Sequence, residues 1–168
     1  KRRKSGANGG TAMNIPMIIN NEKILVQSAA DASLLSVLRK QRLVQVKRGC
    51  ELGICGSCTV LMNDKPVPSC KIPVALAMNK EIITLEHFMK DEMYISIMKG
   101  FTRAGIKLCG YCNSGKIFAA KAILSTSARP TRAKIAEYTQ NLSPCCTDQD
   151  TLINGILYAF EIHNKKGQ

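Results

Sequence analysis

The feature that most constrains this chain is a ten-residue segment, GCELGICGSC at residues 49–58, which contains three cysteines and three glycines. The whole chain has eight cysteines in 168 residues, and they cluster at short spacings. Such clustering is typical of metal binding rather than of a disulfide scaffold. Thiolates bind metals most readily where they are kept reduced, so the cysteine usage favours a cytoplasmic protein.

The first cysteine set has the spacing C-x4-C-x2-C-x11-C and consists of Cys50, Cys55, Cys58 and Cys70. Its first three members match the spacing of plant-type [2Fe–2S] ferredoxins. Because the sulfurs of a cluster accept hydrogen bonds, the loop must wrap closely and point backbone N–H groups inward. Gly49, Gly53 and Gly56 permit the positive φ angles and the close approach that this wrapping requires. A zinc site needs no glycine-punctuated loop, so we predict that this set holds a [2Fe–2S] cluster.

The second cysteine set has the spacing C-x2-C-x32-C-C and consists of Cys109, Cys112, Cys145 and Cys146. The segments CGYCNSG and PCCT each lie just before a predicted helix. Two helix N-termini can therefore converge on one centre, where their dipoles and free N–H groups stabilise the negative charge of bound thiolates. The spacing alone fits both an iron–sulfur cluster and an all-cysteine zinc site.

The first half of the chain has the pattern of a small α+β unit. Apolar residues alternate with period two on both sides of Asn20-Asn21-Glu22 and again around Asn63-Asp64, which predicts two hairpins. A helix is predicted over residues 33–41 with Asp31 as its cap, and a last strand over residues 81–85. Strands around one helix indicate a β-grasp, plant-type ferredoxin-like domain.

After His87 the apolar spacing changes to three and four, which predicts helices. Thr131 is expected to start one of them, and Thr147 with Asp150 resembles a capping box before another. The predicted helices cover residues 94–105, 114–125, 131–139 and 151–163. Four short helices are expected to form a bundle.

The fold class is therefore α+β, with a β-grasp domain followed by a four-helix bundle. We predict three segments: a disordered basic tail at residues 1–13, a ferredoxin-like domain at 14–85 and a helical domain at 86–168. No run of eighteen apolar residues occurs, so no membrane span is expected.

The net charge of +12 suits an acidic partner protein. Nucleic-acid binding is not expected, because four Phe, four Tyr and no Trp offer few stacking platforms and no helix carries a basic stripe. Cations near a cluster raise its reduction potential, which is a second use for a basic balance. The chain lacks paired carboxylates, a Ser/His/Asp set and a phosphate loop, so we predict no catalytic residues.

The order of these motifs resembles a known family. GC-x4-CG-x-C, VPSC, CGYC, PTRAKIAEYTQNL and a cysteine pair followed by Thr are similar to the small iron–sulfur subunit of molybdenum hydroxylases, the xanthine oxidase family. That family includes aldehyde, isoquinoline, nicotinate and carbon monoxide dehydrogenases. The resemblance covers residues 14 to about 163 and uses all eight cysteines.

The resemblance implies two [2Fe–2S] clusters, a solvent-side cluster in the ferredoxin-like domain and a second in the bundle, nearer the molybdopterin. It implies an electron-transfer subunit that relays single electrons from a molybdenum site through both clusters to FAD or an external acceptor. The implied partners are a large subunit with molybdopterin, often as the cytosine dinucleotide, and an FAD subunit or a cytochrome.

Two departures from the family pattern concern the second set. The family usually has Gln before CGxC, in contact with the pterin; here the residue is Leu108, so contact is expected only from the backbone around Cys109 and Gly110. The family's N-L-C-x-C-T-G reads NLSPCCTD, which puts Ser143 or Pro144 at the first ligand position. Both neighbouring cysteines are expected to bind one cluster if the chain turns sharply there, with the Ser143 oxygen as an alternative ligand.

Two other functions fit the residues. One is a free-standing ferredoxin-type carrier, which would not co-purify with a large subunit. The other is a zinc-stabilised interaction module, favoured only by the charge and distinguished by its lack of colour.

Overall fold

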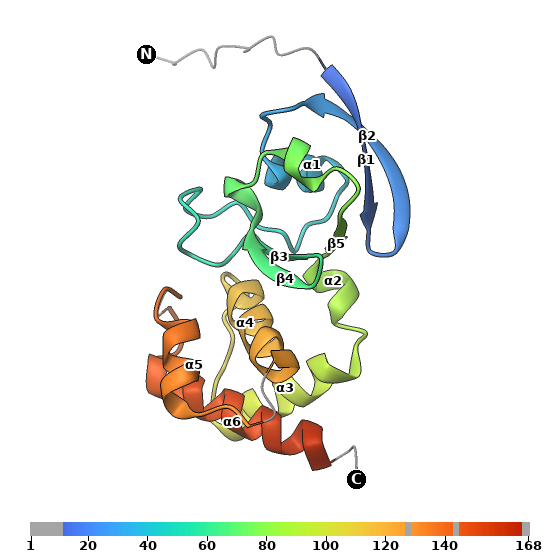
Figure 1. Cartoon of the computed structure of the whole chain (residues 1–168). Coiled ribbons are helices and arrows are strands. Elements are labelled where there is room, and N and C mark those ends of the chain that lie inside the picture. Colours follow the sequence, from blue (N-terminus) through green and yellow to red (C-terminus); the bar gives the residue numbers. More distant parts are fainter. Residues whose placement is uncertain (1–11, 127–128, 143–144, 166–168) are drawn as a thin grey trace, which may run out of the picture.

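The computed structural model describes residues 12–126, 129–142 and 145–165. The predicted tail lies outside the described residues up to position 11, and its last two residues already belong to a strand. The β-rich half of the chain and the helical half lie against each other (Figure 1). Among the described residues, we find no helix of sufficient length and apolarity to cross a membrane.

The first half is a five-stranded sheet with strand order β2-β1-β5-β3-β4. β1 pairs in parallel with β5, and the other neighbouring strands are antiparallel. The strands are β1 (Ala12–Ile19), β2 (Glu22–Ala29), β3 (Thr59–Met62), β4 (Lys65–Pro68) and β5 (Glu81–Ile83). The helix α1 (Leu34–Lys40) buries Leu34, Leu35, Val37 and Leu38 in the same core as the inward-facing residues of β1 and β2. Two short 3₁₀ helices, η1 (Ser69–Lys71) and η2 (Val74–Ala77), complete this half. The predicted β-grasp architecture is confirmed.

Both predicted hairpins form, each with a two-residue turn. Asn20 and Asn21 have φ angles of 52° and 72°, and Asn63 and Asp64 have 46° and 65°. Two consecutive left-handed residues match the right-handed twist of the flanking strands, and Asn and Asp tolerate that conformation best after Gly. Glu22, which the sequence pattern placed in the turn, is the first residue of β2.

Two predicted features of this half are wrong. The helix cap is Ser33, whose hydroxyl accepts from the Ser36 N–H, and not Asp31. The last strand ends at Ile83, because the N–H of Thr84 donates to the Asn20 side chain rather than to a neighbouring strand. Leu85, predicted to end the strand, instead begins the short helix α2 (Leu85–Phe88).

The second half consists of α3 (Glu92–Arg103), α4 (Asn113–Thr126), α5 (Arg132–Thr139) and α6 (Gln149–Lys165). All four predicted helices are present, within a few residues of the expected bounds. Thr131 caps α5 as predicted. The capping box predicted for α6 is wrong, because the cap interactions come from Asp148, which accepts from the N–H and hydroxyl of Thr151.

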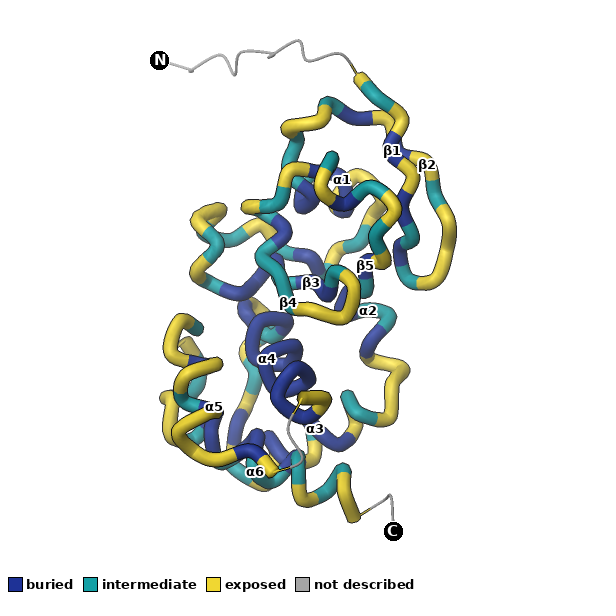
Figure 2. The backbone as a smooth tube through the Cα atoms, viewed as in Figure 1, coloured by how far each residue is buried: buried dark blue, intermediate teal, exposed yellow. Residues whose placement is uncertain are grey.

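The central element is α4, which is buried without a break from Ser114 to Leu124 (Figure 2). One side of α4 packs against α3, α5 and α6, and another side contacts β3 and β4. Two features join the halves at this contact. Lys121 of α4 forms an ion pair with Asp64 in the β3–β4 turn. A Cβ atom added to Gly115 would lie only 2.8 Å from the Cα atom of Gly56.

The closest helix pair is α3 and α6. A Cβ atom added to Gly100 would lie 2.6 Å from the Cα atom of Ala159 and 2.6 Å from the carbonyl oxygen of Gly155. Both atoms belong to the backbone of α6, so the clash can be relieved only by moving a helix. We therefore predict that Gly100→Ala lowers the free energy of unfolding by about 2–3 kcal/mol.

This prediction is measured by chemical denaturation followed by circular dichroism. Alanine is the better helix former, so a loss of stability must come from the contact with α6. Lys99→Ala is the control, since Lys99 is exposed on the same helix. Equal stability of both variants and the natural protein would show that the α3–α6 contact is not tight.

Candidate iron–sulfur centres

The first cysteine loop runs between α1 and β3, and its three glycines are required for two different reasons. Gly53 and Gly56 have positive φ angles of 84° and 77°. Gly49 does not, but a Cβ atom there would lie 2.8 Å from the Sγ atom of Cys55. Backbone freedom explains two of the glycines, and close approach to a sulfur explains the third.

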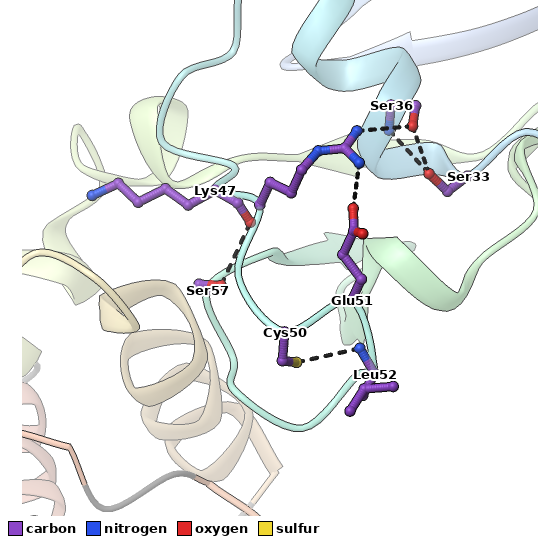
Figure 3. A network of polar contacts seen from close by, with 8 residues as sticks. Ser33, Ser36, Lys47, Cys50, Glu51, Leu52 and Ser57 are labelled. Carbon is purple, nitrogen blue, oxygen red and sulfur yellow. Dashed lines mark hydrogen bonds and ion pairs between the residues drawn. The ribbon is translucent and has the colours of Figure 1, made fainter. Parts of the chain in front are cut away.

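The loop points backbone N–H groups at sulfur atoms, as the sequence predicts. The Leu52 N–H donates to Cys50 Sγ at 3.3 Å (Figure 3), and the Cys50 N–H lies 3.5 Å from Cys55 Sγ. Between them, Glu51 adopts a left-handed φ of 57°. The backbone N–H of Leu52, with that of Cys55, lowers the pKa of Cys50 to about 6. The loop therefore stabilises a thiolate at neutral pH.

Cys70 joins the other three from η1. The hydroxyl and the N–H of Ser69, which is completely buried, both donate to the Cys58 carbonyl, at 2.7 and 3.3 Å. This contact holds Cys70 beside Cys58. Burial, and then the neighbouring Cys58 thiol, raise the pKa of Cys70 to about 11. The pattern VPSC predicted the cysteine, but nothing in the sequence indicated the part played by its neighbour Ser69.

In the second set, the Sγ atoms of Cys109, Cys112 and Cys145 all lie within 4.8 Å of one another. Cys112 is buried and directly precedes α4, whereas the other two are exposed. Gly110 makes the tight CGYC turn possible with a φ of +89°, and its N–H donates to the Asn113 side chain. Residues that are distant in the sequence thus form one group of sulfurs.

Of the neighbouring cysteines, Cys145 belongs to this group and Cys146 interacts with Cys109, so the binding of one cluster by both stays a prediction. The backbone N–H of Tyr111, and then the thiols of Cys145 and Cys146, lower the pKa of Cys109 to about 7. The thiols of Cys109 and Cys112 in turn raise the pKa of Cys145 to about 12. Ser143 and Pro144, which occupy the family's first ligand position, lie outside the described residues.

These donor sets fit a bound iron–sulfur cluster. Each set offers sulfur alone, which selects soft metal centres such as Fe–S clusters or zinc. In the first set, N–H groups are directed at sulfur atoms that would otherwise carry unsatisfied negative charge. Thiols this close oppose one another's ionisation, which raises the pKa of Cys145, and a bound cation removes that conflict.

The two loops that carry the sets contact each other. The Lys47 ammonium, from just before the first loop, donates to the carbonyl of Gly110 in the second. A Cβ atom added to Gly49 would lie 3.2 Å from the Tyr111 hydroxyl. No sequence pattern indicated the contact of Lys47 with Gly110. Leu108, the residue before CGYC, packs against the helical core. Backbone contact with a pterin from around Cys109 and Gly110 stays a prediction.

Two family models match the chain. Residues 17–82 match the 2Fe-2S iron-sulfur cluster binding domain, and residues 84–157 match the [2Fe-2S] binding domain. The fold and the two cysteine sets thus define an iron–sulfur protein of the electron-transfer class, with one ferredoxin-like and one helical [2Fe–2S] domain.

Comparison with similar proteins assigns the chain to one family within this class. The chain is 33% identical over 150 residues to the nicotinate dehydrogenase small FeS subunit of Eubacterium barkeri. The aligned region covers 89% of this chain and 96% of that subunit. The chain is also 32% identical over 153 residues to the xanthine dehydrogenase iron-sulfur-binding subunit of Escherichia coli O157:H7, with coverages of 89% and 96%. The chain belongs to the family of small iron–sulfur subunits of molybdenum hydroxylases.

Solved structures agree in fold. The quinoline 2-oxidoreductase of Pseudomonas putida 86 has a chain that superposes with a TM-score of 0.79 at 28% identity, covering 92% of this chain and 98% of that chain. The aldehyde oxidoreductase of Desulfovibrio gigas superposes with a TM-score of 0.80 at 30% identity over 92% of this chain. This chain corresponds to only 17% of that longer polypeptide.

The thiol pKa values predict an order of reactivity in the metal-free protein. Cys50, with a pKa of about 6, is mostly thiolate at pH 7, whereas Cys70 has a pKa of about 11 and stays protonated. Because the thiolate is the nucleophile, iodoacetamide should modify Cys50 well before Cys70. The Cys50 rate should be half-maximal near pH 6 and level off above about pH 7, while the Cys70 rate keeps rising past pH 9.

Peptide mass spectrometry after timed labelling measures both rates. The same protein in urea is the control, because unfolding should make the two cysteines react alike. Similar pH profiles for both residues in the folded protein would contradict the proposed role of the loop N–H groups.

Proposed function

We propose that this chain is the electron-transfer subunit of a molybdopterin-dependent hydroxylase or dehydrogenase. The observation that carries the proposal is the gathering of the Cys109, Cys112 and Cys145 sulfurs within 4.8 Å of one another, at the CGYC loop that touches the loop of the first set. One [2Fe–2S] cluster would be held by the first set, Cys50, Cys55, Cys58 and Cys70. The other would be held by the second set, Cys109, Cys112, Cys145 and Cys146. When bound, a [2Fe–2S] cluster supplies the ability to take up and release one electron at a time.

The residues of this chain hold and orient the thiolates. The N–H groups of Leu52 and Tyr111 stabilise negative charge on Cys50 and Cys109. Ser69 fixes Cys70 beside Cys58, and the Lys47–Gly110 contact keeps the two loops together. A fixed arrangement of this kind leaves little to reorganise when the charge changes by one unit.

Each set also reaches the protein surface. Leu52 and Ile54, in the first loop, are 66% and 60% exposed. Cys109 and Cys145 are exposed in the second set. Two different partners can therefore approach the two sets, as a subunit that passes electrons between proteins requires. Apolar side chains at such an exposed loop are typical of a protein contact.

The proposed partner at the second set is a large subunit that carries the molybdenum cofactor, molybdopterin, often as its cytosine dinucleotide. At the first set we propose an FAD subunit, a cytochrome or another external acceptor. The naming of several relatives as small subunits supports a multi-chain complex. The net charge of +12 favours acidic partner surfaces. A cytoplasmic location remains a prediction from the cysteine usage.

Metal analysis of the holoprotein tests the cofactor part of this proposal. We expect about four iron atoms and four acid-labile sulfides per chain, because each [2Fe–2S] cluster contributes two of each. Cys55→Ser and Cys112→Ser should each lower the iron content to about two. Each variant is the control for the other, since it should leave the EPR signal of the remaining cluster unchanged. A colourless protein with zinc in place of iron would exclude electron transfer.

Purification of the native complex through a tag on this chain tests the partner part. We expect a larger, molybdenum-containing chain in about equal amount, and its substrate should reduce the clusters of this chain. A tagged chain that retains its iron but elutes alone as a monomer would instead indicate a free-standing carrier.

A further inference from the structure

A buried lysine lies next to the second cysteine set. Lys116, in the first turns of α4, is only 1% exposed and ranks among the largest fully buried side chains of the described residues. Its Nζ atom lies 2.9 Å from the Sγ atom of Cys112, which is itself 2% exposed. Lysine is almost never fully buried unless it is paired with a negative group. Lys116 therefore donates a hydrogen bond to the Cys112 sulfur, and this contact is charge-assisted once that sulfur is a metal-bound thiolate.

The first set has a different surrounding. Its described sulfur contacts come from neutral groups, the N–H groups of Leu52 and Cys50 and the hydroxyl of Ser57. The basic residues nearest in sequence are Lys71 and Arg48, and Arg48 pairs with Glu51 at the surface. A cation in direct contact with a ligand sulfur is thus a feature of the second set among the described residues.

We infer that the Lys116 ammonium sets the reduction potential of the second centre, an inference that rests on the proposed function. A [2Fe–2S] cluster with four thiolates carries about −2 when oxidised and about −3 after it accepts one electron. A cation stabilises the more negative state more strongly, so it raises the reduction potential. Little water reaches Lys116 or Cys112 to screen this interaction.

The acidic residue that shares a cavity with Lys116 does not cancel this effect. Asp148 lines the same small cavity of about 100 Å³ as Lys116. Its two carboxylate oxygens, however, accept hydrogen bonds from the N–H and hydroxyl of Thr151 at 2.8 and 2.7 Å, and the residue is exposed. Its charge is therefore screened by solvent. Lys116 and Cys112 are both buried, so their mutual interaction is the stronger one.

The same helix supplies a matched control. Lys121 is a second buried lysine of α4, 7% exposed, and it pairs with Asp64 rather than with a thiol. Lys121→Met removes a buried ammonium from the same helix and leaves the sulfur contact unchanged. A general effect of losing a buried charge from α4 would be seen in both variants. An effect of the sulfur contact would be seen only at Lys116.

The experiment is a titration of the holoprotein with dithionite at one fixed pH, followed by EPR. Cys70→Ser identifies the EPR component of the first centre, because it alters only that component. We expect Lys116→Met to lower the equilibrium constant for reduction of the second centre at least tenfold, which is 59 mV for a one-electron couple. Lys116→Arg, which keeps the charge, should restore most of the potential, and Lys121→Met should change it less than twofold.

The outcomes separate this inference from the proposed function. Two EPR components in the natural protein with no shift in Lys116→Met would overturn the inference alone, whereas absence of iron from the natural protein would overturn the proposed function. If Lys116→Met cannot retain the second centre, Lys116→Gln decides the question. That variant keeps a hydrogen-bond donor without a charge, so a potential equal to that of Lys116→Arg would contradict the role of the charge.

Discussion

The close approach of Gly56 and Gly115 determines where the two thiol sets lie relative to each other. A Cβ atom added to Gly56 would lie 3.1 Å from the Cα atom of Gly115, and a Cβ atom added to Gly115 would lie 2.8 Å from the Cα atom of Gly56. Gly56 belongs to the first cysteine loop, and Gly115 lies three residues after Cys112. Two loops from separate parts of the chain are therefore in backbone contact, and the Lys47–Gly110 and Lys121–Asp64 interactions form beside this contact.

Local patterns predicted the elements of the fold well, and tertiary contacts decided the details. The turns Asn20-Asn21 and Asn63-Asp64 follow from residues that tolerate left-handed backbone. The cap of α1 did not follow, because several residues in that region can serve as caps. Ser33 is selected because the neighbouring Leu34 N–H donates to the Ile72 carbonyl, a contact with a segment almost forty residues away.

The candidate site was predictable as far as cysteine spacing and glycine content reach. The identity of the side chains that surround the sulfurs could not be predicted. A lysine in an amphipathic helix normally faces water, yet α4 is enclosed on several sides, so Lys116 and Lys121 are buried with it. Gly49 likewise has no positive φ. A side chain is excluded there only because Cys55, Ser57 and Tyr111 lie close to where its Cβ atom would be.

These observations separate two effects of positive charge in this chain. Most of its 24 basic residues are described in the structure and have exposed or half-buried side chains. Dissolved ions screen the electrostatic interactions of such side chains over roughly 8 Å at physiological salt. Such charges act mainly on the approach of partner proteins. A reduction potential responds instead to charges that water cannot reach. One ammonium in contact with Cys112 therefore bears more on electron affinity than the basic balance of the whole chain.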